Sequence, residues 1–182
     1  MEPLKKILKG CLGNNKADQY RLYSHFSKKM YGVCLRYGGS YHEAQDILQE
    51  GFIKVFEKLS TFKGSGSLEG WIKRIMIRTS IEKYRERIIH LKVEDLSETS
   101  GLANENFGPE KLSLDELLNF IQLLPDQYRL VFNLAVIEGL SHKEIGELLS
   151  ITESTSRSNL SRAKSILQGL IEKEQKVIEK VI

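Results

Sequence analysis

The residues of this chain best suited to chemistry lie in one short stretch, "TESTSRSNLSRAKSIL" (152–167), which is rich in hydroxyls and carries an amide and three cations. Hydroxyl groups bind phosphate oxygens, while Arg and Asn side chains reach the edges of bases. The polar residues that fit this chemistry are Thr152, Ser154, Thr155, Arg157, Ser158, Asn159, Arg162 and Lys164. A second set recurs at helical spacing and predicts one buried face, namely Leu160, Ala163, Ile166 and Leu167. A helix with this polar face suits the major groove of duplex DNA. Alternatively, the polar residues form the solvent-exposed face of a helix in a bundle.

The segment just before this stretch completes a helix-turn-helix pattern. The sequence "SHKE" (141–144) is typical of a capping box at the start of a helix, and an apolar helical stripe follows it. "SIT" (150–152) is expected to form a short turn, with Thr152 as the cap of the next helix. Two short helices joined by a tight turn, the second polar and basic on its outer face, are typical of DNA-binding proteins.

A second candidate for nucleic-acid binding is a predicted helix at 68–91, preceded by the glycine-serine loop "FKGSGS" (62–67). Between Lys73 and Lys92, seven Lys and Arg residues stand against two Glu residues, so the charge excess has one sign. Aromatic rings together with cations suit single-stranded DNA, because bases stack on the rings while the phosphates are neutralised. The candidate residues are Phe62, Lys63, Ser65, Ser67, Trp71, Lys73, Arg74 and Arg78. Trp71 alone is better interpreted as a core residue, since it adjoins apolar neighbours in a small domain.

A third cluster is typical of a protein-docking surface. The residues opposite the apolar helical stripe of "AQDILQEGFIKVF" (44–56) include Asp46, Gln49, Glu50 and Ile53. A single exposed apolar residue is common and usually carries no function. An exposed Ile53 surrounded by polar groups, however, also fits a contact with another protein.

No arrangement of residues in the sequence predicts catalysis, metal binding or a cofactor. The four histidines lie in separate predicted elements without ligand spacing, and the sequence lacks a phosphate-binding glycine loop and a nucleophile elbow. Cys11 and Cys34 form no metal motif, which favours reduced thiols and a cytoplasmic protein. The first residues lack the apolar region of a signal peptide, and no run is long and apolar enough to insert into a membrane.

Charge is distributed unevenly along the 182 residues, although the net charge is only +3. Residues 1–92 hold 18 Lys and Arg against 9 Asp and Glu, as expected of a polyanion-binding domain. Residues 93–112 hold one Lys and five Asp and Glu residues, and they are rich in Ser, Asn and Gly. They are predicted to form a flexible acidic linker. Residues 113–182 hold 8 Lys and Arg against 10 Asp and Glu, so any basic surface in this part must be local.

Helical periodicity extends over nearly the whole chain, and no stretch alternates with a period of two for long enough to predict a strand. We therefore predict an all-α fold of two small helical domains, 1–92 and 113–182, of which the second is a helix-turn-helix. The helices expected in the first domain are 17–37, 42–59 and 68–91, with Ser40 as the cap of the second. The expected inward residues of the third helix are Trp71, Ile75, Ile81 and Tyr84.

Three segments of the sequence resemble one protein family. They are "HEAQDILQEGFIKVFEKL" (42–59), "FKGSGSLEGWIKRIM" (62–76) and "LPDQYRLVFNLAVIEGLSHKEIGELLSITESTSRSNLSRAK" (124–164). In content, order and spacing they resemble the extracytoplasmic-function group of bacterial RNA polymerase sigma factors. The resemblance covers most of the chain, the linker excepted, and implies a sigma factor that directs promoter recognition, strand opening and transcription initiation.

The resemblance implies specific partners. The residues that match the family's "DxxQE" motif are Asp46, Gln49 and Glu50, which implies docking on the clamp helices of the largest subunit of core RNA polymerase. Ile53 lies beside them on the same predicted face. A further contact with the flap region of polymerase and regulation by an anti-sigma factor are also implied, together with a cytoplasmic location.

The resemblance also implies how promoter DNA is bound. Residues 62–67 match the loop that captures an unstacked base of the downstream promoter element. The residues that match the "W…RI" motif of the strand-melting helix are Trp71, Arg74 and Ile75. The residues that match the recognition helix for the duplex upstream element are Thr155, Ser158, Arg162 and Lys164.

The sequence departs from the family pattern at several positions. Arg78 stands where Asn is usual, and Glu82 stands where Asp is usual. Glu153 and Ser154 replace the usual glycine region at the head of the recognition helix. The helix-turn-helix pattern itself has two unusual residues, Ser150 at a turn where Gly is usual and Ser156 where an apolar residue is usual. A stand-alone helix-turn-helix transcriptional regulator with a helical dimerisation domain is the main alternative, and a helical adaptor without a DNA role is a more distant one.

Overall fold

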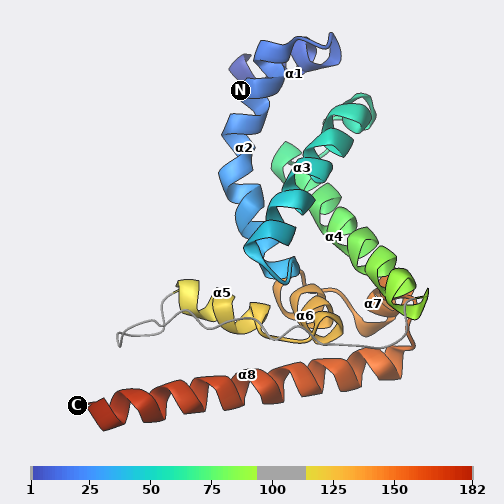
Figure 1. Ribbon diagram of the computed structural model, residues 1–182. Coiled ribbons are helices and arrows are strands. Elements are labelled where there is room, and N and C mark those ends of the chain that lie inside the picture. The colour runs from blue at the N-terminus through green and yellow to red at the C-terminus, as the bar shows by residue number, and fades with distance from the viewer. Residues whose placement is uncertain (1, 94–113, 182) are drawn as a thin grey trace. The chain divides into compact units, whose positions relative to one another are not determined.

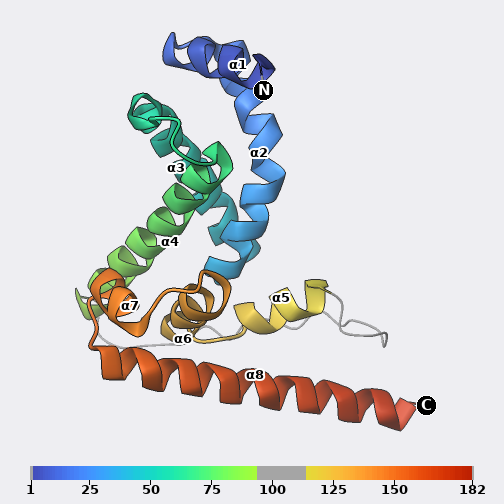
Figure 2. The same cartoon turned by 180° about the vertical axis from the view of Figure 1, so that it is seen from behind.

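The computed structural model describes residues 2–93 and 114–181, and each element in these ranges is helical (Figure 1, Figure 2). In chain order the elements are α1 (Glu2–Leu12), α2 (Lys16–Tyr37), α3 (Tyr41–Lys58), η1 (Leu59–Thr61), α4 (Leu68–Val93), α5 (Leu114–Gln122), α6 (Asp126–Phe132), η2 (Asn133–Ile137), α7 (His142–Leu149) and α8 (Glu153–Val181). The predicted all-α class is therefore confirmed. The predicted linker 93–112 lies outside the described residues, except for Val93 at the end of α4.

The chain divides into two compact units, Met1–Lys83 and Tyr84–Ile182. The division falls inside α4, whereas the sequence predicts that the first domain ends at residue 92. The first unit contains α1 to α3 and most of α4, and the second contains α5 to α8. The predicted domain limits stay predictions, because the linker is not among the described residues.

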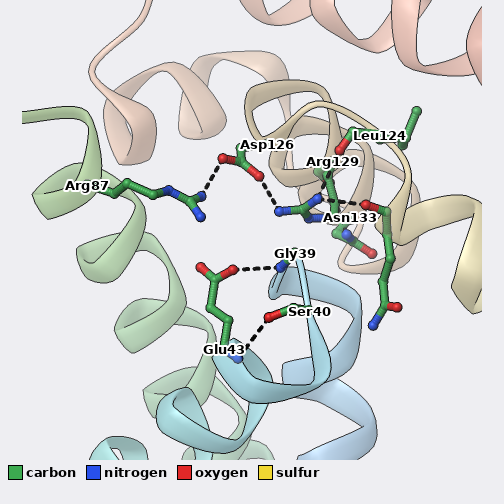
Figure 3. A network of polar contacts seen from close by, with 9 residues as sticks. Gly39, Ser40, Glu43, Arg87, Leu124, Asp126, Arg129 and Asn133 are labelled. Carbon is green, nitrogen blue, oxygen red and sulfur yellow. Dashed lines mark hydrogen bonds and ion pairs between the residues drawn. The ribbon is translucent and has the colours of Figure 1, made fainter. Parts of the chain in front are cut away.

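In the first unit, α2 and α3, which correspond to the predicted helices 17–37 and 42–59, pack against each other through their apolar faces (Figure 1, Figure 2). The buried residues of α2 are Leu22, Phe26, Met30, Val33, Cys34 and Tyr37, and those of α3 include Ala44, Ile47, Leu48, Phe52 and Val55. The predicted cap of α3 is confirmed, because the N–H of Glu43 donates to Ser40 Oγ at 3.1 Å. Glu43 Oε2 in turn accepts from the N–H of Gly39 at 2.8 Å, so this helix start is satisfied from both sides (Figure 3).

Helix α4 buries Ile72 and Met76 completely, although the sequence predicts neither of them as an inward residue. Of the predicted inward residues, Ile81 is 4% exposed, whereas Trp71, Ile75 and Tyr84 are only half-buried. The reason lies partly on α3, where a Cβ added at Gly51 would lie 2.3 Å from Met76 Sδ. The missing side chain at Gly51 therefore makes room for Met76, and α4 crosses α3 closely at this point.

The second unit packs α5, α6 and α7 against the long helix α8. One core cluster consists of Ile121, Leu124, Ala163 and Leu167, with Phe120, Tyr128, Phe132 and Ile166 packed around it. The connection between α5 and α6 is held by Arg129, which is 2% exposed. Its Nη1 donates to the carbonyls of Gln122 at 3.0 Å and Leu124 at 2.9 Å, and its Nη2 pairs with Asp126 (Figure 3).

The predicted helix-turn-helix is formed by α7 and α8. The capping box of Ser141 and Glu144 is present, and Thr152 Oγ1 accepts from the N–H of Thr155 at 3.0 Å, so both predicted caps are confirmed. Ser150 adopts the left-handed conformation, with φ 57° and ψ 43°, in which glycine is the usual residue. Gly146 permits the tight turn, because a Cβ there would lie 2.8 Å from the carbonyl oxygen of Ile151.

Candidate interaction surfaces

The predicted docking face lies on the outer side of α3. Ile53 is 58% exposed, and Asp46 and Gln49 are exposed beside it, while the opposite side of the helix is buried in the first unit. Asp46 Oδ2 lies 3.5 Å from His42 Nδ1 one turn earlier. Ile53 is thus exposed among polar side chains, as the sequence predicts, and it is accessible to a partner.

Glu50 differs from its neighbours on this face because it is already engaged within the chain. Its Oε1 lies 2.5 Å from Lys54 Nζ, and its Oε2 lies 3.2 Å from Lys83 Nζ on α4. Lys54 Nζ also lies 2.6 Å from Glu82 Oε2 on α4. These four residues, Glu50, Lys54, Glu82 and Lys83, are called the α3–α4 charge cluster below. In the sequence, Glu82 stands out only as a departure from the family pattern, and no local pattern indicates this cluster.

The charge cluster shifts the titration of two of its members. Burial raises the pKa of Glu50, but hydrogen bonds from Lys54 and Lys83 outweigh it, so that its pKa is lowered from the ordinary 4.5. Burial likewise lowers the pKa of Lys54, but the hydrogen bonds to Glu50 and Glu82 outweigh it and raise this pKa above 10.5. Both groups are therefore charged in the folded protein over the whole neutral range.

These shifts predict the pH range in which the cluster stabilises the fold. The contribution of Glu50 is present above pH 4.5 and lost as the pH falls through its lower folded pKa, and that of Lys54 is present below pH 10.5. We expect Lys54→Met to lower the melting temperature by about 2–4 °C at pH 7, the equivalent of about 1 kcal/mol. The difference from the unsubstituted protein should shrink below pH 4.5. Thermal unfolding followed by circular dichroism between pH 3 and pH 9 measures it, and a pH-independent difference would contradict the electrostatic origin.

The predicted single-strand surface combines the loop 62–67 with the first turns of α4. The rings of Phe62 and Trp71 lie 5.5 Å apart between centroids, at an interplanar angle of 50°. Both rings are half-buried, so Trp71 is neither a fully buried core residue nor a free one. The glycines of the loop have positive φ angles, 74° at Gly64 and 95° at Gly66, which side chains rarely adopt.

The polar residues of this surface extend from the loop along α4. Those that are exposed are Lys63, Ser65, Ser67, Arg74 and Arg78, while Lys73 is half-buried. Ser67 also serves the helix itself, since its Oγ accepts from the N–H of Gly70 at 3.4 Å. Lys83 contributes to the charge cluster with Glu50, so the exposed cationic face of α4 within the first unit is centred on Arg74 and Arg78.

The predicted recognition face is exposed along the first turns of α8. The exposed residues are Thr152, Ser154, Arg157, Ser158, Arg162 and Lys164, and Thr155 is half-buried. The hydroxyls at its start are linked, because Thr152 Oγ1 lies 2.9 Å from Ser154 Oγ and 2.7 Å from Thr155 Oγ1. Arg157 pairs with Glu153, and Arg162 Nη1 donates to the hydroxyl of Tyr128 at 3.2 Å.

Two polar residues of α8 are buried, and one of them, Asn159, differs from the sequence expectation. Asn159 is only 3% exposed, so the prediction that its amide faces outward to DNA is wrong. Asn159 belongs instead to the face that packs on the rest of the second unit, one turn before the buried Ala163. Ser156 is fully buried where an apolar residue was expected, and its Oγ is satisfied by His142 Nδ1 of α7 at 2.9 Å.

In the described part of the chain, no group of three or more His, Cys, Asp or Glu residues is arranged to hold a metal ion. No helix in the same part is long and apolar enough to cross a membrane.

Comparison with known proteins identifies two family regions. Residues 22–87 match Sigma-70 region 2, and residues 114–167 match Sigma-70 region 4. The chain is 32% identical over 155 residues to the ECF RNA polymerase sigma factor SigW of Bacillus subtilis, covering 79% of this chain and 83% of SigW. It is 30% identical over 158 residues to SigE of Mycolicibacterium smegmatis, covering 84% of this chain but only 61% of that longer relative.

A solved structure shares the fold. The sigma factor RpoE of Bartonella quintana, crystallised in complex with the anti-sigma factor NepR, aligns with a TM-score of 0.56 at 19% identity. The alignment covers 85% of this chain and 97% of RpoE. With both regions matched in order and a relative at 32% identity, the chain belongs to the extracytoplasmic-function group of RNA polymerase sigma factors and is not a stand-alone regulator.

Proposed function

We propose that this sigma factor binds core RNA polymerase through the outer face of α3, which carries Asp46, Gln49, Glu50 and Ile53. The clamp helices of the largest subunit are the proposed partner of this face, and the flap region is the proposed partner of the second unit. The observation that carries the proposal is Ile53, 58% exposed among polar side chains on a helix whose other side is core. Covering an exposed apolar side chain with a partner removes its surface from water, which favours binding.

Promoter opening is assigned to the loop 62–67 and α4. A base flipped out of the stack costs a few kcal/mol, which capture in a protein pocket offsets. The paired rings of Phe62 and Trp71 offer an apolar surface for such a base, and Arg74 and Arg78 neutralise the phosphates of the displaced strand. Duplex DNA of the upstream element is bound by the exposed residues of α8.

The protein itself catalyses no reaction in this proposal, because polymerase supplies the chemistry of RNA synthesis. It acts in the cytoplasm, where core polymerase is found. An anti-sigma factor is proposed as its regulator, by analogy with the complex in which the structurally similar RpoE was crystallised. No cofactor or metal ion is needed for any of these steps.

A transcription experiment tests the proposed function. Core RNA polymerase purified from the same organism is incubated with fragmented genomic DNA, with and without this protein, and run-off transcripts are sequenced. We expect a small set of start sites that appear only with the protein and share upstream and downstream elements. Identical transcripts with and without the protein would contradict the proposal. One recovered promoter, called the selected promoter below, then serves as the template for defined tests.

Arg162 and Asn159 make a matched pair for testing the recognition face. Arg162 is exposed and Asn159 is buried on the same helix, so only Arg162→Ala removes a group that DNA can reach. We expect Arg162→Ala to weaken binding of the selected promoter by the holoenzyme by about 1–3 kcal/mol. Asn159→Ala should lower the melting temperature instead and leave the affinity of the folded protein within twofold. Fluorescence anisotropy with upstream variants of the promoter measures both, and equal losses on all variants would make Arg162 a phosphate contact.

A further inference from the structure

The α3–α4 charge cluster links the two functional helices of the first unit at two points. Lys54 of α3 reaches Glu82 of α4 at 2.6 Å, and Glu50 of α3 accepts from Lys83 of α4 at 3.2 Å. Lys54 and Glu50 are themselves joined at 2.5 Å, so the order Glu82, Lys54, Glu50, Lys83 alternates in sign without a break. The side chains of Lys54 and Lys83 are 23% and 24% exposed and that of Glu50 is 36% exposed, whereas that of Glu82 is 51% exposed. Salt therefore screens the Glu50 contacts less than it screens the contact between Lys54 and Glu82.

The geometry of the cluster restrains rotation of α4 as well as its distance from α3. Glu82 and Lys83 are consecutive, and consecutive residues point about 100° apart around a helix axis. One ion pair alone would let α4 roll about its axis, whereas two contacts at this angle hold it from two sides. Rolling of α4 would turn its exposed cationic face away from the strand that it binds.

A second attachment lies earlier along α4, where Met76 occupies the space left open by Gly51. Met76 and Glu82 are separated by about 9 Å along the helix axis. Arg78 lies between the two attachments, and Arg74 lies just before the first. The cationic face is therefore presented by a segment of α4 that contacts α3 at Met76 and again at Glu82 and Lys83.

We propose that Lys54 and Glu82 are positioning residues for strand opening, which hold α4 in the orientation that directs Arg74 and Arg78 to the displaced strand once α3 is docked on polymerase. This inference rests on the proposed function of α3 and α4. It assigns to Glu50 a structural part in addition to docking, because its two carboxylate oxygens accept from lysines of both helices. It also explains the glutamate at position 82, whose length lets it reach Lys54 across the helix pair.

The test compares duplex and pre-opened DNA. Holoenzymes carrying Lys54→Met, Glu82→Gln or both changes are mixed with the selected promoter, and open-complex formation is followed by 2-aminopurine fluorescence in the downstream element. We expect the rate on duplex DNA to fall about fivefold to tenfold. On the same promoter with a mismatched, already open downstream element the rate should fall less than twofold. The double variant should lose no more than twofold beyond Lys54→Met, because both changes break one connected cluster.

Lys58→Met is the matched control, since Lys58 is an exposed lysine one turn later on α3. It should open duplex promoter at the unsubstituted rate. Affinity for core polymerase, measured by anisotropy, should stay within twofold for Lys54→Met. The inference would be overturned if the opening rate fell equally on duplex and pre-opened templates and the affinity for core polymerase fell by the same factor. The cluster would then contribute only to the stability of the fold. Unchanged opening by both single variants would overturn it as well.

Arg74→Ala separates failure of this inference from failure of the proposed function. If Arg74→Ala slows opening while Lys54→Met and Glu82→Gln do not, α4 opens DNA but the charge cluster does not position it. If Arg74→Ala has no effect either, the assignment of α4 to strand opening fails, and with it the basis of the inference.

Discussion

Ile53→Glu is expected to weaken binding of core RNA polymerase about 30-fold or more, the loss typical of a central interface residue. A carboxylate at this position would be buried without a partner when the interface forms, and an unpaired buried charge is costly. The fold should be unaffected, because Ile53 is 58% exposed and contributes little to the core. Competition binding to core polymerase measures the loss, and circular dichroism should give the same helical signal and melting temperature as the unsubstituted protein.

Tyr41→Glu is the control for this prediction. Tyr41 is 60% exposed at the start of the same helix, so it tests whether any loss of exposed apolar surface on α3 has the same effect. We expect its affinity for polymerase to stay within twofold. If Ile53→Glu binds as tightly as the unsubstituted protein, the docking face lies elsewhere on the first unit.

Arg129→Met is expected to have the largest effect on stability, a loss of about 3–5 kcal/mol, because two buried carbonyl groups are left without their donor. Two carbonyls, those of Gln122 and Leu124, would lose their donor, and Asp126 would lose the partner on its own helix. Because these contacts close the turn between α5 and α6, the loss should also reduce binding of duplex promoter. Thermal unfolding of the full chain and promoter binding by the holoenzyme measure the two effects.

Arg157→Met is the matched control for Arg129→Met. Arg157 also pairs with a carboxylate on its own helix, but its side chain is 65% exposed, and such pairs contribute 1 kcal/mol at most. The melting temperature of the Arg157→Met variant should therefore differ little from that of the unsubstituted protein. Arg129→Lys should recover only part of the stability, because an ammonium group does not match the planar fork that serves two carbonyls and a carboxylate. Equal stability of both Met variants would contradict the structural importance of Arg129.

The helices and their starts were largely predictable from the sequence, because they depend on local signals. The apolar faces of α2 and α3, the caps at Ser40 and Thr152 and the capping box at Ser141 each involve residues within one or two turns. Helix α1 has no counterpart among the predicted helices, although Leu4, Ile7, Leu8 and Cys11 recur there at helical spacing. This spacing is itself sufficient to predict a helix over these residues.

The residues that sequence reasoning misjudged depend on contacts between helices. Trp71 and Ile72 are adjacent and both apolar, and the space at Gly51 on another helix contributes to the choice by accommodating Met76 on the side of Ile72. Asn159 was assigned by its chemistry to the DNA face, but its position relative to Ala163 puts it on the buried side. The pairing of Lys54 with Glu82 joins residues 28 positions apart, and no local pattern indicates it.

Helix α8 carries its packing residues and its candidate DNA-contacting residues on different faces. Ser156, Asn159, Ala163 and Leu167 are buried, while Ser154, Arg157, Ser158 and Arg162 are exposed. Substitutions at exposed positions usually change stability by less than about 0.5 kcal/mol. The outward residues are therefore free to vary in evolution while the scaffold that holds them persists. A duplicated copy of this gene could acquire a new set of promoters through a few changes on one side of α8, with no need to refold the domain that presents them.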